Sequence, residues 1–390
     1  MVSDDSGAAE DGGEEPTETD RAKVRSELGK LKDFAAGVSL DDLRRGDWFA
    51  RLLRYSLDQY SHEVDAAYFQ AKYPQLPPDA VVAARIQLAA RYASIEGGLS
   101  AGAYTGAVAA TIGSGGGASP LTLPAAGVSF VLDLLYLSHL QLRLAYDIAV
   151  LSRVPLDLQD PEDLWTLIRI AFAIKSGEAG REAISKGVPV LVRPVLNKIF
   201  SGSSLTAARS LPVVGRYLLQ RNVIKFAIPA VGVPLSMAVN YWSTKVAGSH
   251  AVRLFGSEAR IAEAARRMVT STSHHGELLW VLWMVIKADA LVHESERLLL
   301  KRVTAMVSDL DSELAAITDL GSTLDHDQEK MWSRLAAVSG DLRPLYDAGV
   351  VAAAADGKIN VNELKVLRKL ADCCSVPFDE DAVRRAARRE

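Results

Sequence analysis

Four acidic residues occupy matching places in an internal repeat near the carboxyl end of the chain, and carboxylate oxygens are ligands that hard divalent cations prefer. An apolar helix, an acidic turn and a second helix occur twice, as LLWVLWMVIKADALVHESERLLLKRV and as LYDAGVVAAAADGKINVNELKVLRKL. The first copy holds Asp289 and Glu296, and the second holds Asp356 and Glu363, each 67 residues later. One interpretation is a shared acidic site in which these four side chains meet and hold Ca²⁺ or Mg²⁺.

The same acids have a purely structural interpretation, which stays open beside the first. Asp-Gly favours a turn, Asn360 can cap the following helix, and Glu363 three residues later completes a capping box. The stretch AAAADGKINVNE resembles a calcium loop of the EF-hand type only in part, because Ala352 and Ala354 stand where side-chain oxygens are needed. The sequence therefore argues against an EF-hand.

Residues 97–132 carry no charged side chain and lie between Glu96 and Asp133. Such a surface must be covered by the rest of the protein, by a partner or by a lipid bilayer. Glycines and two prolines within residues 113–124 divide the stretch into two shorter helical pieces. The second piece continues into charged residues, which argues against a permanent membrane crossing. We expect a packed helical hairpin whose membrane contact is shallow or conditional.

Glycine recurs at every fourth residue of the first piece, at Gly98, Gly102 and Gly106. This spacing places the three glycines on one face of a helix, where another backbone can approach closely. Membrane helix pairs and tightly packed soluble helices both use such a face. The glycine-rich helix is thus predicted to serve membrane contact or helix packing.

Asp133, His139 and Asp147 follow at helical intervals in the second piece and its continuation. Together they are the candidate polar groups of an enzyme site, since carboxylates and imidazoles carry out acid and base chemistry. Polar residues spaced in this way more often serve packing and solubility. A soluble enzyme is therefore kept as the alternative to a protein without catalytic activity.

Helical periodicity extends over most of the 390 residues, and no alternating apolar pattern is long enough for a strand, so the fold is predicted to be all-α. We expect a disordered acidic tail over residues 1–20 and an N-terminal helical segment over residues 21–79. A larger helical domain is expected over residues 80–256 and a smaller helical bundle over residues 257–390. Ser39 is expected to cap a helix at its N-terminus.

Composition narrows the class of protein. The net charge of −4 gives no case for nucleic acid as a partner. The only two cysteines, Cys373 and Cys374, are adjacent and poorly placed to bridge each other, which indicates a reducing compartment. The acidic amino terminus lacks the basic start and apolar run of an export signal. A cytoplasmic location is expected.

Three motifs in order resemble the EcsC family of bacterial proteins over roughly residues 80–256. They are the Gly/Ala-rich helix, AAGVSFVLDLLYLSHLQLRLAYDIA and IPAVGVPLSMAVNYWSTKVAGSHAVRLF. The resemblance implies a hydrophobic helical domain, sometimes membrane-associated, named for a component encoded beside an ABC transporter. It supplies no established catalytic residues. A longer basic insert before Leu211 departs from the family pattern.

The signature A-D-x-x-[VI]-x-x-x-E, present in both copies of the repeat, resembles the TerB-like fold of tellurite-resistance and related stress proteins. The resemblance covers about 130 residues. It implies a small helical bundle that docks proteins, and it allows a divalent cation at the acidic turns.

Four arginines close the chain, at Arg384, Arg385, Arg388 and Arg389. A solvated helix end explains them, because cations are favourable near a helical carboxyl terminus. A contact with anionic lipid headgroups or an acidic partner is the other interpretation.

These features together predict a non-enzymatic bacterial accessory protein at the inner, cytoplasmic face of a membrane in a stress or secretion setting. The EcsC-like domain would contact the membrane surface or a membrane-protein partner. The TerB-like domain would dock protein partners or respond to a cation. The sequence does not indicate an oligomeric state.

Overall fold

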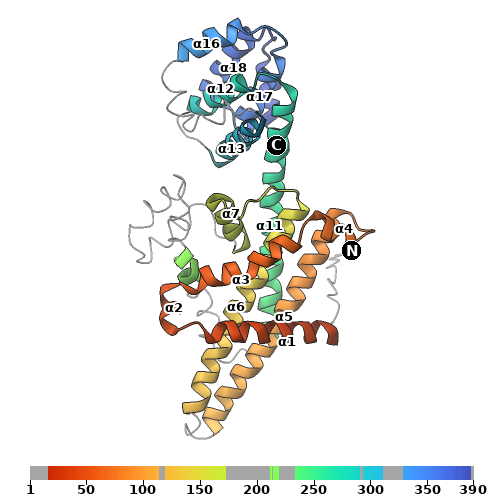
Figure 1. The fold of residues 1–390 in the computed structure, drawn as a ribbon, viewed down its shortest axis with the longest axis vertical. Coiled ribbons are helices and arrows are strands. Elements are labelled where there is room, and N and C mark those ends of the chain that lie inside the picture. The colour runs from red at the N-terminus through yellow and green to blue at the C-terminus, as the bar shows by residue number, and fades with distance from the viewer. Residues whose placement is uncertain are drawn as a thin grey trace, which may run out of the picture. The chain divides into compact units, whose positions relative to one another are not determined.

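The computed structural model describes residues 16–113, 119–172, 211–212, 214–218, 233–289, 293–310 and 328–387 (Figure 1). In residues 104–113 and 119–127 it describes helical backbone but no side chains, and the side chain of Asp289 is also not described. All regular elements in these ranges are helices, which confirms the all-α prediction. Most of the predicted acidic tail, residues 1–15, lies outside the described residues, whereas the first helix already begins at Glu18.

The chain divides into two compact units, Met1–Phe255 and Gly256–Glu390. The boundary falls within the long helix α11, Val233–Ser271, which contributes residues to both units.

Within residues 16–172 the first unit has seven helices. They are α1 (Glu18–Ala36), α2 (Leu40–Arg45), α3 (Trp48–Glu63), α4 (Ala66–Lys72), α5 (Pro78–Gly113), α6 (Ser119–Leu151) and α7 (Pro161–Ala171). Side-chain hydrogen bonds cap the N-terminus of α2. The hydroxyl of Ser39 accepts a hydrogen bond from Asp42 N, and the Asp42 carboxylate accepts one from Ser39 N. This capping box confirms Ser39 as an N-cap.

The pair formed by α5 and α6 is the centre of the first unit, and the two helices lie side by side. Helices α1, α3, α4 and α7 pack against α6, and α1 also packs against α5. Helix α3 packs against α6, and both helices contribute fully buried side chains, Trp48 and Phe49 from α3 and Leu134, Leu135 and Leu142 from α6. Removal of this apolar surface from water is the main stabilising contribution to the unit.

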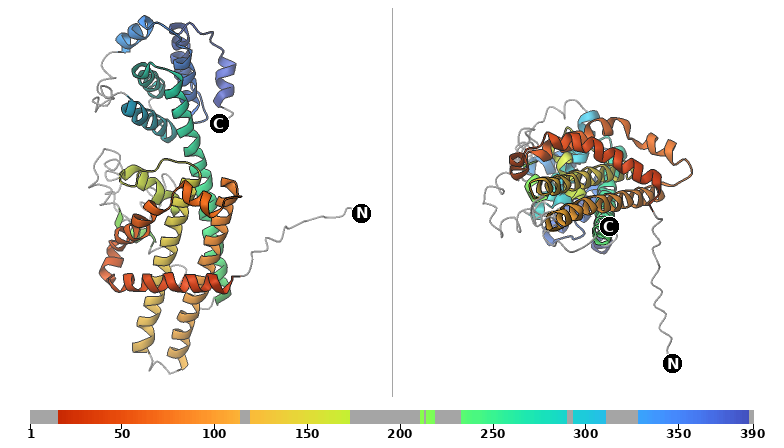
Figure 2. Two further views of the ribbon diagram at one scale, coloured as in Figure 1. Left: turned by 45° about the vertical axis from the view of Figure 1, so that its right-hand side comes forward. Right: turned by 90° about the horizontal axis from the view of Figure 1, so that it is seen from below.

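The distal ends of α5 and α6 extend past α1 as a two-helix projection (Figures 1 and 2). In both views no other described helix lies beside these ends. The projection coincides with the uncharged stretch 97–132. The α5–α6 pair thus carries its charged side chains in one part and the uncharged stretch in the other.

One helical segment among the described residues, Val128–Leu151 in α6, is long and apolar enough to cross a bilayer by length and composition. More than half of this segment is buried inside the unit. It also carries Asp133, Arg143 and Asp147, each with a hydrogen-bonding partner in the protein. We therefore treat it as a core helix.

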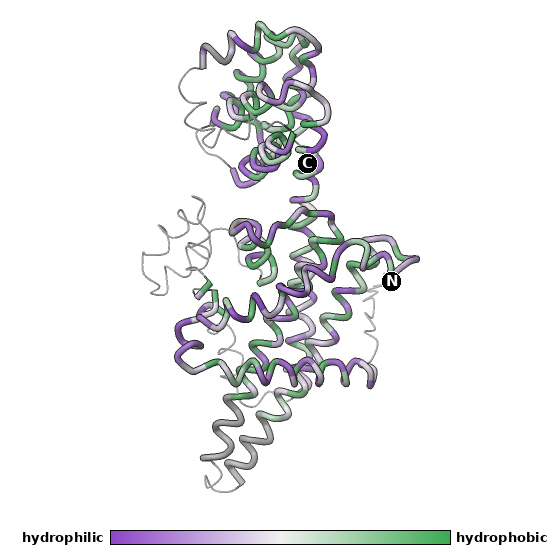
Figure 3. Tube along the Cα trace, in the orientation of Figure 1, coloured by the Kyte–Doolittle hydropathy of each residue, from purple (hydrophilic) through white to green (hydrophobic). Residues whose placement is uncertain are grey.

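The second unit contains α12 (His275–Ile286), the short 3₁₀ turn η1 (Lys287–Asp289), α13 (Glu294–Leu310), α16 (Gln328–Ala337), α17 (Arg343–Ala354), α18 (Val361–Cys373) and α19 (Glu380–Ala387). Helix α12 is central, because it packs against α13, α17 and α18. Both copies of the sequence repeat are helix–turn–helix units, α12–α13 and α17–α18. Figure 3 shows apolar and polar residues alternating along these helices, as amphipathic helices require.

We predict that Gly46→Ala lowers the free energy of unfolding by about 2 kcal/mol, because Gly46 has a left-handed backbone that alanine adopts poorly. A Cβ there would also overlap the backbone carbonyl of Pro212. The matched control is Gly29→Ala in the exposed interior of α1, where no described atom lies within 4 Å of the new Cβ. The control should stabilise by about 0.5–1 kcal/mol. Urea unfolding followed by circular dichroism tests both, and equal midpoints for the two variants would contradict the assignment.

Candidate functional site

A buried ion pair joins α5 to α6 in the first unit. Arg85 donates from Nε and Nη2 to Oδ2 of Asp147, at 2.8 and 2.5 Å, and Tyr60 donates from its hydroxyl to Oδ1 at 2.7 Å. Asp147 is fully buried, and burial raises the pKa of its carboxyl against the opposing attraction of Arg85. Burial tends to lower the pKa of Arg85, but the attraction of Asp147 outweighs it and raises the pKa. The opposite charges of Arg85 and Asp147 thus compensate each other inside the protein.

His139 lies on the same side of α6 and is buried as well. Its Nδ1 is 2.9 Å from Oγ of Ser56. Burial, assisted by the positive charge of Arg143, lowers the pKa of His139 to about 3. The imidazole is therefore neutral near pH 7 and poorly matched to proton transfer at that pH.

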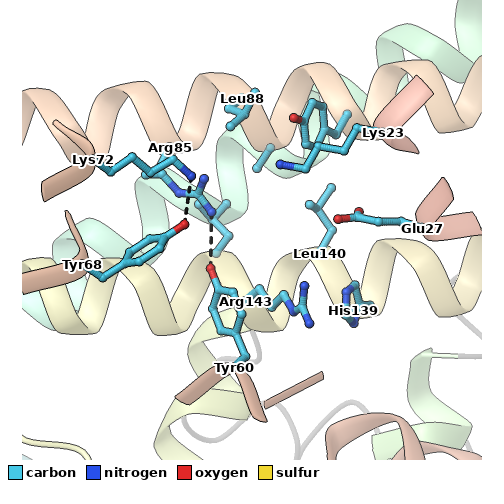
Figure 4. Close-up of a pocket in the computed structure, with 13 residues that line it drawn as sticks. Lys23, Glu27, Tyr60, Tyr68, Lys72, Arg85, Leu88, His139, Leu140 and Arg143 are labelled. Atoms are coloured by element: carbon cyan, nitrogen blue, oxygen red, sulfur yellow. Dashed lines mark hydrogen bonds between the residues drawn. The ribbon is translucent and has the colours of Figure 1, made fainter. Parts of the chain in front are cut away.

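A cavity of about 100 Å³ adjoins these residues and is shown in Figure 4. Arg143 forms part of its wall, with the guanidinium 4.4 Å from the ring centroid of Tyr60 and Nε donating to the carbonyl of Ser56 at 3.1 Å. Side chains from α1, α3, α4, α5 and α6 all line the cavity, so its shape depends on how these five helices pack together.

A second buried polar cluster lies at the base of the projecting hairpin. Nδ2 of Asn240 donates to Oε2 of Glu96 at 3.2 Å and to Oδ1 of Asp133 at 3.3 Å. Ser100 donates a short hydrogen bond from its hydroxyl to Oε1 of Glu96. All four side chains are buried. This Asn240 cluster, comprising Glu96, Ser100, Asp133 and Asn240, joins α5, α6 and α11 through groups that would be costly to bury alone.

The glycine face of α5 is only partly explained by helix packing. A Cβ at Gly98 would lie 3.1 Å from Sδ of Met237 in α11, whereas no described atom lies within 4 Å of one at Gly102. Gly106 falls where surroundings are not described. The tightest approach is at Gly97, which the four-residue spacing did not indicate: a Cβ there would lie 2.7 Å from Nδ2 of Asn240.

The three candidate enzyme groups have separate partners. Asp133 belongs to the Asn240 cluster, His139 contacts Ser56, and Asp147 pairs with Arg85. Along one straight helix, Asp133 and Asp147 are about 21 Å apart at 1.5 Å per residue. The structure does not bring the three side chains into one site.

In the second unit, two of the four predicted metal ligands cap helices. Oε2 of Glu363 accepts from Asn360 N at 2.7 Å, and Oδ1 of Asn360 accepts from Glu363 N at 3.0 Å, which completes the expected capping box. Oε2 of Glu296 accepts from His293 N at 2.8 Å in the equivalent place. Both glutamates are almost fully buried. A structural role is thus established for each of them.

Asp356 links the two copies of the repeat, since its Oδ2 is 3.3 Å from Nε2 of His293 and its Oδ1 accepts from Lys358 N at 2.8 Å. Asp289 ends η1. Within the part of the chain that the structure describes, no three His, Cys, Asp or Glu side chains are grouped to hold a metal ion. The divalent-cation site and the docking role of this unit stay predictions.

The terminal arginines are partly paired with nearby acids. Arg384 donates to Oε1 of Glu380 at 3.0 Å, and Arg385 lies 3.7 Å from Oδ2 of Asp379. Arg388 and Arg389 lie outside the described residues. Local pairing of the first two reduces the charge available to an anionic surface.

Sequence reasoning missed Arg85, Tyr60 and Glu96 as partners in these networks. Each is an ordinary polar residue on a helix, with a partner far along the chain; Arg85 and Asp147 are 62 residues apart. The one available signal for Glu96 was its place as the last charge before the uncharged stretch.

Replacing Asn240 tests the cluster that it bridges. Asn240→Leu keeps the size of the side chain but leaves two buried carboxylates without their shared donor, so we expect a loss of about 3 kcal/mol of stability. Adding Glu96→Gln should restore part of that loss, because a neutral amide can both donate and accept. Urea unfolding measures both variants. Wild-type stability of Asn240→Leu would show that the bridge is not needed.

The lowered pKa of His139 predicts that the free energy of unfolding depends on pH. The pKa of His139 in the folded state is about 3, below the ordinary 6.5. Below about pH 6.5 the unfolded chain therefore binds a proton at this residue that the folded chain does not bind. Between pH 7 and pH 5 this residue should lower the free energy of unfolding by about 2 kcal/mol. His139→Gln should lack this component. Urea titrations at both pH values check the prediction, and identical pH dependence in wild type and variant would contradict it.

No protein-family model matches this chain, and no curated protein or solved structure matches it significantly. The resemblances to the EcsC family and the TerB-like fold therefore stay predictions that rest on the motifs quoted for them. The function must be inferred from the geometry of the chain itself.

Proposed function

We propose that this protein binds a membrane surface by inserting the distal part of the α5–α6 hairpin into one leaflet of the bilayer. The observation that carries the proposal is the coincidence of two properties. The uncharged stretch 97–132 forms the ends of both helices, and these ends project past α1 without another described helix beside them (Figures 1 and 2). An uncharged projection of this kind suits a lipid environment better than water.

The contacts of α5 indicate where packing inside the unit ends. Gly97 and Gly98 lie against Asn240 and Met237 of α11. One turn further along, no described atom approaches Gly102, and on the returning helix the side chain of Val128 is 48% exposed. The region distal to Gly102 and Val128 is therefore the part offered to the membrane.

The length of this region fits one leaflet. Residues 102–113 of α5 extend about 18 Å at 1.5 Å per residue. The hydrocarbon core of a bilayer is about 30 Å thick, so the hairpin would reach roughly its middle and return. This geometry supports a peripheral attachment rather than a crossing.

The charged residues nearest to the hairpin are compatible with such an attachment. Glu96 and Asp133 are held by Asn240 inside the protein, so neither carboxylate would have to enter lipid. The proposed setting is the inner face of a bacterial cytoplasmic membrane, where the protein would act as an accessory component in stress or secretion. Among the described residues, no geometric observation favours the alternative of a soluble enzyme.

Flotation with protein-free vesicles tests the proposal. Vesicles of phosphatidylcholine, with and without phosphatidylglycerol, are incubated with the full chain and separated on a density gradient. Ile112→Glu places a charge one residue from the distal end of α5 and should weaken flotation at least about tenfold, since a charge inside the hydrocarbon costs a few kcal/mol.

Leu76→Glu is the matched control, because Leu76 is a 47% exposed apolar side chain of the same unit that lies outside the hairpin. It should float as wild type does. A wild-type chain that stays at the bottom of the gradient with both kinds of vesicle would overturn the proposal. Equal flotation of Ile112→Glu and wild type would show that another surface makes the contact.

A further inference from the structure

The cavity beside Arg85 collects positive charge from four different helices. Lys23 comes from α1, Lys72 from α4, Arg85 from α5 and Arg143 from α6. Lys23 and Lys72 enter from opposite sides in Figure 4. Like charges brought together in this way repel one another, so their convergence favours the binding of a negative charge.

The protein supplies only part of that compensation. Asp147 neutralises Arg85 from behind the cavity, and Glu27 is the one acidic side chain among the lining residues. Within the described ranges, neither Lys23 nor Lys72 forms an ion pair with a carboxylate. Three cations thus face a single acid across the cavity.

Hydrogen-bond donors also outnumber acceptors at this place. Lys72 donates from Nζ to the hydroxyl oxygen of Tyr68 at 2.9 Å, so the proton of that hydroxyl can be donated onward. The ammonium of Lys23 lies 5.6 Å from the ring centroid of Tyr92, a contact that uses none of its three N–H donors as a conventional hydrogen bond. Arg143 donates from Nε to Ser56 and retains its terminal nitrogens as further donors.

The volume of the cavity limits the size of the ligand that it can hold. A volume of about 100 Å³ has room for several water-sized atoms, since one water needs about 10–15 Å³ by the same measure. A tetrahedral oxyanion, with five heavy atoms, fits this space. A large organic molecule does not fit without movement of the helices.

We propose that this cavity binds a phosphate group, with Lys23 and Lys72 supplying charge from opposite sides and Tyr68 donating a hydrogen bond. The phosphate can come from a free anion or from a lipid headgroup, which present the same oxygens. Arg85 is fixed by Asp147 and shapes the floor of the site. This proposal is independent of membrane insertion by the hairpin.

Calorimetric titration of the full chain with inorganic phosphate tests the site, and a parallel titration uses vesicles that contain phosphatidic acid. The variant is Lys23→Gln combined with Lys72→Gln, both exposed residues whose replacement leaves the buried network intact. The control is Lys32→Gln, an exposed lysine of α1 that does not line the cavity. The double variant should bind phosphate at least about tenfold more weakly than wild type, and the control should match wild type.

Binding of inorganic phosphate that is lost in the double variant supports the site and identifies a free anion as sufficient. Binding of phosphatidic acid vesicles alone, lost in the same variant, supports the site and identifies a headgroup as the source. If wild type binds neither probe, or the double variant binds as wild type does, the proposal is wrong. Circular dichroism confirms that the double variant is folded.

Discussion

The first unit depends on one side-chain amide, that of Asn240, which holds two buried carboxylates at the base of a helical hairpin. A carboxylate removed from water loses strong hydration and needs hydrogen-bond donors in its place. Asn240 supplies donors to Glu96 and Asp133 together, and Ser100 supplies another to Glu96. Because the three main partners lie on α5, α6 and α11, this contact fixes where those helices can meet.

The arrangement separates charge along the α5–α6 pair. On one side of the Asn240 cluster, the helices carry Arg85, His139, Arg143 and Asp147, and these residues bind each other or nearby α3. On the other side, residues 97–132 carry no charged side chain. The polar part is therefore anchored in protein, and the uncharged part is the one that we propose to contact lipid. An apolar segment of α6 that would pass for a membrane span by composition is instead the core of the unit.

Local sequence signals predicted much of the fold. The Ser39 N-cap, the Asn360–Glu363 capping box and the Asp-Gly turn involve residues within four positions of one another, so their hydrogen bonds follow from the sequence alone. The two helices of the hairpin were predictable from the glycine run between two periodic stretches, but the predicted break at residues 113–124 was too long, because α6 begins at Ser119 and contains both prolines. By contrast, Asn240 reaches Glu96 across 144 residues, and helical periodicity carries no information about such pairs. For the same reason the cations around the cavity were not recognised as a group, and three polar residues of α6 were grouped although each has its own partner.

The most direct measurement of membrane insertion is the depth of a probe at the end of the hairpin. In a chain with Cys373→Ser and Cys374→Ser, a fluorophore is attached through Ser119→Cys, at the first residue of α6, or through Ser26→Cys, at an exposed site of α1. Vesicles contain lipids with a nitroxide quencher in their acyl chains. Insertion predicts strong quenching of the probe at residue 119 and little at residue 26. Equal and weak quenching at both positions would contradict entry of the hairpin into the bilayer.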